Sequence, residues 1–177
     1  LKNKYSSNLS GDEKNSFNDH LKTINKQINQ IENLVNEFSD FARMPKPIFK
    51  KINLLTVIKE NITLLKQIDD TIKINYPNNK GEYFITADSE QISRVFFNLV
   101  KNSIESLEEK ASKNPDLTKK IDIEIENKKD YISLIITDNG IGFSEDNLNN
   151  ILKPYFTTKE KGTGLGLSIV NKIINDH

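Results

Sequence analysis

The sequence predicts an α+β fold: a two-layer α/β sandwich preceded by one long helix. Two observations support this prediction. Apolar residues recur at alternating steps of four and three from Phe17 to Ala42, which is the spacing of one long amphipathic helix. After Pro45 and Pro47, segments with helical spacing are interspersed with short alternating segments typical of strands. This mixture of helices and strands, which we expect to be antiparallel, favours a sheet covered by helices.

The long helix has a start and a stop in the sequence. Ser10 or Asp12 is the expected cap, and the helix is expected to end at Met44–Pro47, because proline lacks the N–H donor that a helix needs. A helix of about 30 residues is about 45 Å long and cannot bury its apolar stripe alone. Two interpretations remain open: a helix of an intramolecular bundle, or the second helix of a dimerisation hairpin.

The elements that follow the two prolines are expected in this order. They are first a helix over Asn53–Ile68 capped by Asn53, and strands over Thr71–Tyr76 and Tyr83–Ala87. A helix capped by Asp88 or Ser89 and reaching Leu107 follows, and then a polar loop over Ser112–Lys120. The last elements are a hairpin of antiparallel strands Ile121–Glu126 and Tyr131–Thr137, a short helix over Leu148–Leu152, and a last helix from Leu165 to Ile174.

The composition excludes several classes of function. The 177 residues carry 25 basic and 25 acidic side chains, so the basic excess typical of a nucleic-acid binder is absent. The chain contains no cysteine and only two histidines, which excludes a thiolate or histidine-rich metal site. No run of 18 apolar residues could span a membrane, and the first residues do not resemble a signal peptide. We expect a soluble, intracellular-facing piece.

Two asparagines in the middle of the helix that begins near Asp88 are the first candidate site. Asn98 and Asn102 are four residues apart and therefore share one helix face. An amide oxygen is a suitable ligand for Mg²⁺, which keeps most of its waters and takes few protein ligands. In a chain this rich in asparagine, an ordinary polar helix face explains the pair equally well.

A second candidate is Asp138-Asn139-Gly140-Ile141-Gly142-Phe143, directly after a predicted strand, where two glycines would let the backbone approach a ligand. Alone, this segment could be a simple Asn-Gly turn. A third is Lys153–Lys159, in which an aromatic pair precedes two threonines and a lysine. Alone, that pattern is uninformative.

The fourth candidate opens the last helix. Lys161-Gly162-Thr163-Gly164-Leu165-Gly166-Leu167 places three glycines at alternate positions before a helix. Backbone N–H groups at a helix N-terminus are unpaired and attract anions. The segment fits neither the dinucleotide-binding motif nor the P-loop, because no strand precedes it and no Lys-Ser/Thr pair follows the glycines.

In their order and spacing, these four segments closely resemble the N, G1, F and G2 boxes of the ATP-binding domain of sensor histidine kinases. That domain has the Bergerat fold of the GHKL superfamily. The resemblance extends from about Asn53 to the C-terminus. Leu34–Pro47 and Phe156–Lys159 further resemble the nitrogen-regulation kinases of the NtrY and NtrB types, with NtrY favoured. The resemblance implies that residues 1–47 are mainly the second helix of a dimerisation hairpin with its linker. Residues 48–177 would be the ATP-binding domain without its last strands.

The resemblance also implies a role for each matching residue, with ATP and Mg²⁺ as the bound groups. Asp138 would accept the adenine amino group, Gly140 and Gly142 would pack near the base, and Asn102 would bind Mg²⁺ with Asn98 lining the same site. A mobile lid over about Ser144–Gly162 would be anchored by Tyr155 and Phe156. The remaining predicted ATP-site residues lie at or after the end of this lid: Lys159, Gly162, Thr163, Gly164, Leu165, Gly166 and Leu167.

Asn98 helps to distinguish phosphoryl transfer from ATP hydrolysis. ATP-hydrolysing relatives carry a glutamate four residues before the Mg²⁺-binding asparagine, whereas Asn98 cannot act as a general base. Phosphoryl transfer to a histidine requires positioning and charge stabilisation more than a base. Many kinases also carry a basic residue three positions after the asparagine. Glu105 stands there in this chain, which shifts the expected phosphate contacts to Lys159 and Lys161.

The sequence contains no segment like the phosphoacceptor motif of the family. His20 is expected to be a surface residue, and His177 is assigned no role. The resemblance implies a cytoplasmic part of an inner-membrane-anchored sensor that dimerises through its hairpin, serves a response regulator and binds no nucleic acid. Two alternatives remain: a GHKL-type ATPase that hydrolyses ATP for conformational work, and a dimerisation module with a dead nucleotide pocket.

Overall fold

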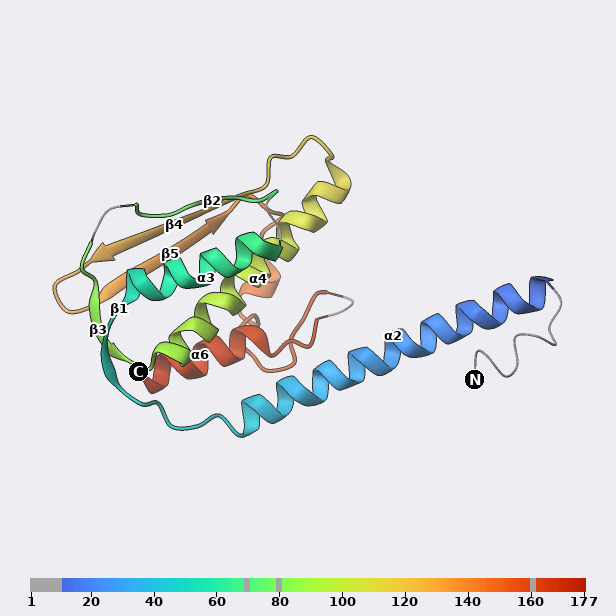
Figure 1. Ribbon diagram of the computed structural model, residues 1–177, viewed down its shortest axis with the longest axis horizontal. Coiled ribbons are helices and arrows are strands. Elements are labelled where there is room, and N and C mark those ends of the chain that lie inside the picture. Colours follow the sequence, from blue (N-terminus) through green and yellow to red (C-terminus); the bar gives the residue numbers. More distant parts are fainter. Residues whose placement is uncertain (1–10, 69–70, 79–80, 160–161) are drawn as a thin grey trace. The chain divides into compact units, whose positions relative to one another are not determined.

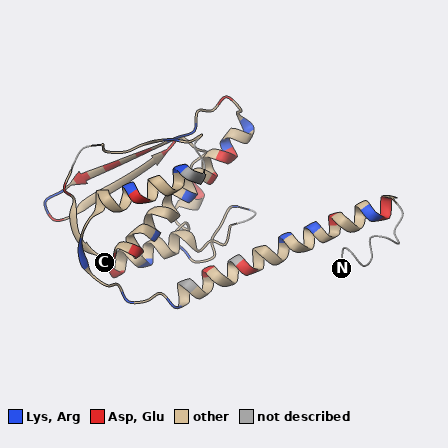
Figure 2. Ribbon diagram, viewed as in Figure 1, with Lys and Arg blue, Asp and Glu red and all other residues tan. Residues whose placement is uncertain are grey.

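The computed structural model describes residues 11–68, 71–78, 81–159 and 162–177. These residues belong to two compact units. One comprises the described residues among 1–44 and 158–163, and the other comprises the described residues among 45–157 and 164–177. Among the described residues, no helix is long and apolar enough to cross a membrane. Basic and acidic side chains are interspersed along both units (Figure 2).

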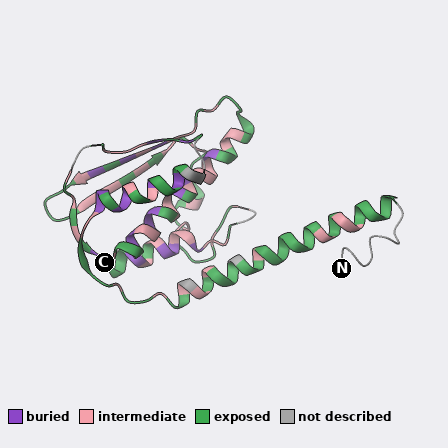
Figure 3. Cartoon of the chain, viewed as in Figure 1, coloured by how far each residue is buried: buried purple, intermediate pink, exposed green. Residues whose placement is uncertain are grey.

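The first unit is dominated by the helix α2 (Gly11–Ala42), as the heptad spacing predicts (Figure 1). The predicted cap at Ser10 lies outside the described residues. The helix ends just before Met44-Pro45, with a last backbone hydrogen bond of 2.9 Å from Arg43 N to Ser39 O. Side chains of the heptad stripe remain between 46 % and 61 % exposed, namely those of Ile24, Ile28, Ile31, Val35 and Phe38 (Figure 3).

In its described residues, the second unit has two sheets and four helices. Its strands are β1 (Lys50–Asn53), β2 (Lys73–Asn75), β3 (Phe84–Ala87), β4 (Lys120–Asn127) and β5 (Ile132–Asp138). Its helices are α3 (Leu54–Ile68), α4 (Ser89–Lys113), α5 (Glu145–Leu148) and α6 (Gly166–Asp176). β1 and β3 form an antiparallel pair, whereas the other three strands form a sheet in the order β2–β4–β5.

The α+β two-layer prediction is confirmed. Figure 1 shows α3 and α4 along one face of the β2–β4–β5 sheet. Between the layers, Ile121 and Ile123 of β4 pack in the same apolar cluster as Ile58 of α3 and Phe96 of α4, all of them almost completely buried. Burying such a side chain contributes about 1.5–3 kcal/mol to folding, so this layer of contacts fixes α4 on the sheet.

Both predicted helix caps in this unit are present. The Asp88 carboxylate accepts the N–H groups of Glu90 (3.0 Å) and Gln91 (3.1 Å) at the start of α4. The Asn53 side-chain oxygen accepts the N–H of Leu55 (3.1 Å) in the first turn of α3. Satisfying these otherwise unpaired donors explains why both helices begin where the sequence predicts.

Asp88 also holds the linker. Its second oxygen accepts the N–H of Ile48 at 2.8 Å, and the side chain of Gln91 donates to the carbonyl of Pro45 at 3.0 Å. The N–H of Asp88 donates to Nε2 of His177 at 3.1 Å. The hydrogen bond from Ile48 is the largest factor that lowers the pKa of Asp88 below its usual 3.8. The linker, the start of α4 and the residue that follows α6 therefore meet at Asp88.

Three details of the prediction are wrong. The strand β1 is missing from it, because two exposed lysines give this short segment no apolar alternation. The short helix is α5 (Glu145–Leu148), and the predicted stretch Leu148–Leu152 forms turns after it. The strands are not all antiparallel, since β2 pairs parallel to β4. The hairpin of β4 and β5 is confirmed as an antiparallel pair.

Candidate functional site

One face of α4 carries four polar side chains at intervals of four residues: Asn98, Asn102, Ser106 and Lys110. We call these residues the α4 row. All four are partly buried. Residues spaced by four lie almost above one another on a helix, so the row is continuous along the helix. The sequence prediction included its first two members and missed Ser106 and Lys110.

Asn98 lies against the start of α6. Its side-chain nitrogen donates to the carbonyl of Arg94 at 2.9 Å, which fixes the orientation of the amide. Its oxygen lies 3.3 Å from the point that a Cβ on Gly166 would occupy. The third glycine of the predicted glycine-rich segment thus allows α6 to approach the α4 row closely. The structure brings the first and fourth predicted segments together.

The second predicted segment lies farther along the same row. A Cβ on Gly140 would be 2.2 Å from Oγ of Ser106 and 2.8 Å from its backbone carbon, so only glycine fits there. The carboxylate of Asp138 accepts the N–H of Gly140 at 2.9 Å, and Oγ of Ser106 accepts the N–H of Gly142 at 3.4 Å. Gly142 has a φ of +71°, which favours glycine. The loop therefore packs its backbone directly on α4.

The same loop, Asp138–Gly142, is also bound to β4. The side chain of Asn139 accepts the N–H of Lys120 at 2.9 Å and donates to the carbonyl of Thr118 at 2.9 Å. Nζ of Lys110 donates to the carbonyls of Asn139 (2.7 Å) and Gly140 (3.1 Å). The simple hairpin turn that the sequence allowed here is wrong, because the segment does not connect two paired strands.

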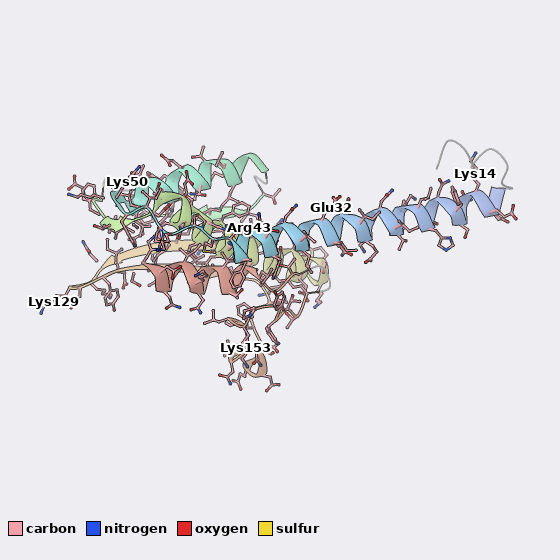
Figure 4. The ribbon with its side chains drawn as sticks, turned by 90° about the horizontal axis from the view of Figure 1, so that it is seen from below. Lys14, Glu32, Arg43, Lys50, Lys129 and Lys153 are labelled. Carbon is pink, nitrogen blue, oxygen red and sulfur yellow. The ribbon has the colours of Figure 1, made fainter. Side chains whose placement is uncertain are left out.

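The aromatic pair of the third segment meets the glycine-rich segment through the backbone. The N–H of Tyr155 donates to the carbonyl of Gly164 at 3.0 Å. Tyr155 has a φ of +66°, which is rare for a residue with a side chain and costs of the order of 1–3 kcal/mol. Its ring is exposed, whereas Phe156 is partly buried. The chain before Tyr155 follows turns that include Lys153 (Figure 4).

The N-terminus of α6 has the properties of an anion site. Leu165 is completely buried and precedes Gly166 and Leu167 in the first turn. In contrast to α4, this helix has no side chain capping its N-terminus. N–H groups in a first turn without such a cap, next to a glycine that admits a ligand, can bind phosphate oxygens.

Three predicted site residues belong to the first unit, with α2. The N–H of Gly162 donates to the carbonyl of Lys159 at 3.1 Å. The hydroxyl of Thr163 donates to the carboxylate of Glu37 on α2. The structure groups these three residues with α2 and the other predicted residues with the second unit. Lys161 lies outside the described residues.

The donor set fits a nucleotide with a hydrated cation better than a protein-bound metal. Among the residues that the structure describes, no three His, Cys, Asp or Glu side chains form a group that could hold a metal ion. The row instead offers amide oxygens, one carboxylate lies on the adjoining loop, and backbone N–H groups lie in the first turn of α6. Mg²⁺ held by one amide oxygen, several waters and phosphate oxygens suits this arrangement.

Comparison with known proteins gives consistent results. Residues 87–177 match the family model of histidine kinase-, DNA gyrase B-, and HSP90-like ATPases. The whole chain is 37 % identical over 177 residues to an NtrY-like protein of Rickettsia prowazekii named as a sensor histidine kinase, and covers 28 % of it. It is 33 % identical to the nitrogen regulation protein NtrY of Azorhizobium caulinodans over 181 residues, which is all of this chain and 23 % of that protein.

A solved structure shows the same fold. The histidine kinase ThkA, in a crystal structure of its complex with the response regulator protein TrrA, superposes with a TM-score of 0.69 at 26 % identity. The match covers 89 % of this chain and 43 % of that one. The chain thus spans about a quarter of the length of its curated relatives and less than half of ThkA.

Proposed function

The chain belongs to the family of histidine kinase-, DNA gyrase B-, and HSP90-like ATPases, and we propose on that premise that it is the Mg·ATP-binding part of an NtrY-like sensor histidine kinase. One observation carries the proposal. A single helix face holds Asn98 against Gly166 and Ser106 against Gly140, so three of the four predicted segments converge on the α4 row. The remaining segment, which contains Tyr155, is hydrogen-bonded to the glycine-rich segment at Gly164.

The nucleotide is bound along this row. Asp138 accepts the adenine amino group, and Gly140 and Gly142, which carry no side chains, leave room for the base. Asn102 holds Mg²⁺, which neutralises charge on the phosphates when bound. The N–H groups at the start of α6 receive phosphate oxygens, as the helix N-terminus without a side-chain cap and the small Gly166 favour.

The reaction is phosphoryl transfer to a histidine rather than hydrolysis. Asn98 is held by its hydrogen bond to the Arg94 carbonyl, and an amide cannot accept a proton from water. An imidazole is a competent nucleophile near neutral pH, so the site needs to position the phosphates and stabilise their charge. The acceptor is a histidine outside this chain, and the phosphoryl group then passes to a response regulator.

The partner of α2 is a second copy of the complete protein. The stripe of apolar side chains along α2 is about half exposed, and a helix with this spacing is stable when another helix covers the stripe. We therefore assign residues 1–47 to a dimerisation hairpin and its linker, and residues 48–177 to the ATP-binding domain. The complete protein is a membrane-anchored sensor whose kinase part lies in the cytoplasm.

Thermal shift and phosphotransfer measurements test this function. Mg·ADP at 100 times its Kd should stabilise the chain by about 2.7 kcal/mol. Labelled Mg·ATP should leave the chain itself unlabelled and should label a histidine on an added helical hairpin that carries the phosphoacceptor. Absence of any shift with Mg·ADP and Mg·ATP would favour a dead pocket. Steady phosphate release that disappears in Asp138→Asn would favour an ATPase.

A further inference from the structure

Lys110 is the last member of the α4 row, three turns beyond Asn98. Its ammonium group donates to two successive backbone carbonyls, those of Asn139 at 2.7 Å and Gly140 at 3.1 Å. Both carbonyls directly follow Asp138 in the chain. Hydrogen bonds from a charged donor are stronger than those between neutral groups, and two from one cation fix the course of the backbone.

We propose that Lys110 is a positioning residue for the base of the bound nucleotide. It holds the backbone of the Asp138–Gly142 loop, and through it the Asp138 carboxylate, in the place where that carboxylate meets the adenine amino group. The inference rests on the proposed nucleotide site. It concerns a residue that does not itself contact the nucleotide.

The surroundings of the loop support this role. The Asp138 carboxylate accepts the N–H of Gly140, so its orientation depends on where the Gly140 backbone lies. Asn139 binds the loop to β4 through its side chain on one side. On the other side, Lys110 attaches the loop to α4 through the carbonyls of Asn139 and Gly140. Removing the ammonium group leaves the attachment to β4 and the contacts with Ser106 intact, but it removes both hydrogen bonds that hold the backbone next to Asp138 on its α4 side.

The neighbouring Lys113 offers a matched control. It is on the same helix and forms an exposed ion pair with Glu109 at 3.0 Å. Lys113→Met removes the same charge one turn away without touching the loop. Lys110→Arg retains a cation that can donate to both carbonyls.

The test is a set of binding titrations with Mg·ATP and with the Mg²⁺ complex of inosine triphosphate. Inosine carries a carbonyl oxygen where adenine has its amino group, so it cannot donate the amino hydrogen bond that Asp138 accepts in the proposed site. We expect Lys110→Met to weaken Mg·ATP binding about tenfold, which corresponds to about 1.4 kcal/mol. Binding of the inosine nucleotide should change by less than twofold. Lys110→Arg should recover most of the affinity, and Lys113→Met should resemble the wild type.

Two results would overturn the proposal. If Lys110→Met binds Mg·ATP within twofold of the wild type, the loop does not need this lysine. If it loses both nucleotides equally, Lys110 supports the fold and not the base site. A wild-type chain that binds neither nucleotide contradicts the proposed function itself, and this inference falls with it.

Discussion

Gly164 lies directly on the backbone of Tyr155. A Cβ added to Gly164 would be 2.4 Å from the carbonyl carbon of Tyr155, and the Gly164 carbonyl accepts the Tyr155 N–H at 3.0 Å. Both residues have a positive φ, +72° and +66°. The aromatic segment and the glycine-rich segment are thus held together by contacts between their backbones. Neither segment indicates this contact in the sequence.

Gly164→Ala should therefore disrupt the site. An alanine pays about 1–2 kcal/mol for the left-handed conformation, and its methyl group would also collide with the Tyr155 backbone. We expect a fall of several degrees in Tm and a loss of nucleotide-dependent stabilisation, both measured by thermal unfolding. Gly142→Ala is the control. Gly142 has a similar φ but no atom within 4 Å of an added Cβ, so only the conformational cost applies to the Tm measured without nucleotide. Equal effects of both substitutions would contradict the contact.

The two asparagines of the α4 row should differ in their effect on Mg²⁺. Asn102→Ala is expected to weaken Mg²⁺-dependent ADP binding by at least tenfold, because it removes the proposed ligand. Asn98→Ala should cost much less, since Asn98 is oriented by the Arg94 carbonyl and lines the site. Titration of ADP with and without Mg²⁺ separates the two effects. Equal and negligible losses would contradict the assignment of Asn102.

The stability contributed by Asp88 should depend on pH. Its pKa is lowered chiefly by the hydrogen bond from Ile48, so the ionised carboxylate stabilises the folded state above the unfolded pKa of about 3.9. This contribution is lost as pH falls through the lower pKa of the folded state. Asp88→Asn should reduce the free energy of unfolding by about 1 kcal/mol at pH 7, and the difference from wild type should shrink below pH 4.

Urea unfolding at pH 7 and at pH 3 measures this difference. Asp130→Asn, at the exposed turn between β4 and β5, is the control for removing a carboxylate. A deficit in Asp88→Asn that is equally large at both pH values would mean that shape rather than charge is responsible.

Phe96 and Phe97 are adjacent on α4 but should differ strongly in their contribution to stability. Phe96 is 0 % exposed in the core, whereas Phe97 is 45 % exposed. Phe96→Ala should cost about 3–5 kcal/mol through lost burial and a cavity. Phe97→Ala should cost well under half of that in the same urea titration. A comparable loss at both positions would contradict the orientation of α4 on the sheet.

Local chemistry made much of the fold predictable. Asp88 caps α4 because an oxygen must satisfy the first N–H groups of a helix, and that requirement is visible in the sequence. The β4–β5 hairpin was visible because apolar residues alternate along both strands. β1 was not visible, because its pairing with β3 depends on a segment more than thirty residues away and its own lysines are exposed.

The glycines and asparagines of the candidate site could be predicted from the sequence. Ser106 and Lys110, which contact the loop beside them, could not. Ser106 and Lys110 gave no signal by residue type in a lysine-rich chain. The available signal was their position, four and eight residues after Asn102, on the helix face already under consideration. Their contacts with the Asp138–Gly142 loop, which is distant in sequence, are evident only in the folded structure.

The α4 row also limits how this part of the gene can change in length. A helix turns 100° with each residue, so inserting one residue between Asn102 and Ser106 would rotate Ser106 and Lys110 away from the loop while Asn98 stayed beside Gly166. Substitutions along the row alter one contact at a time. An insertion or deletion within the thirteen residues from 98 to 110 would rotate one end of the α4 row relative to the other. The contacts at the two ends of the candidate site could then no longer form together. We therefore expect that residues cannot be inserted or deleted within this part of α4. The polar segment after Lys113 should tolerate changes in its length.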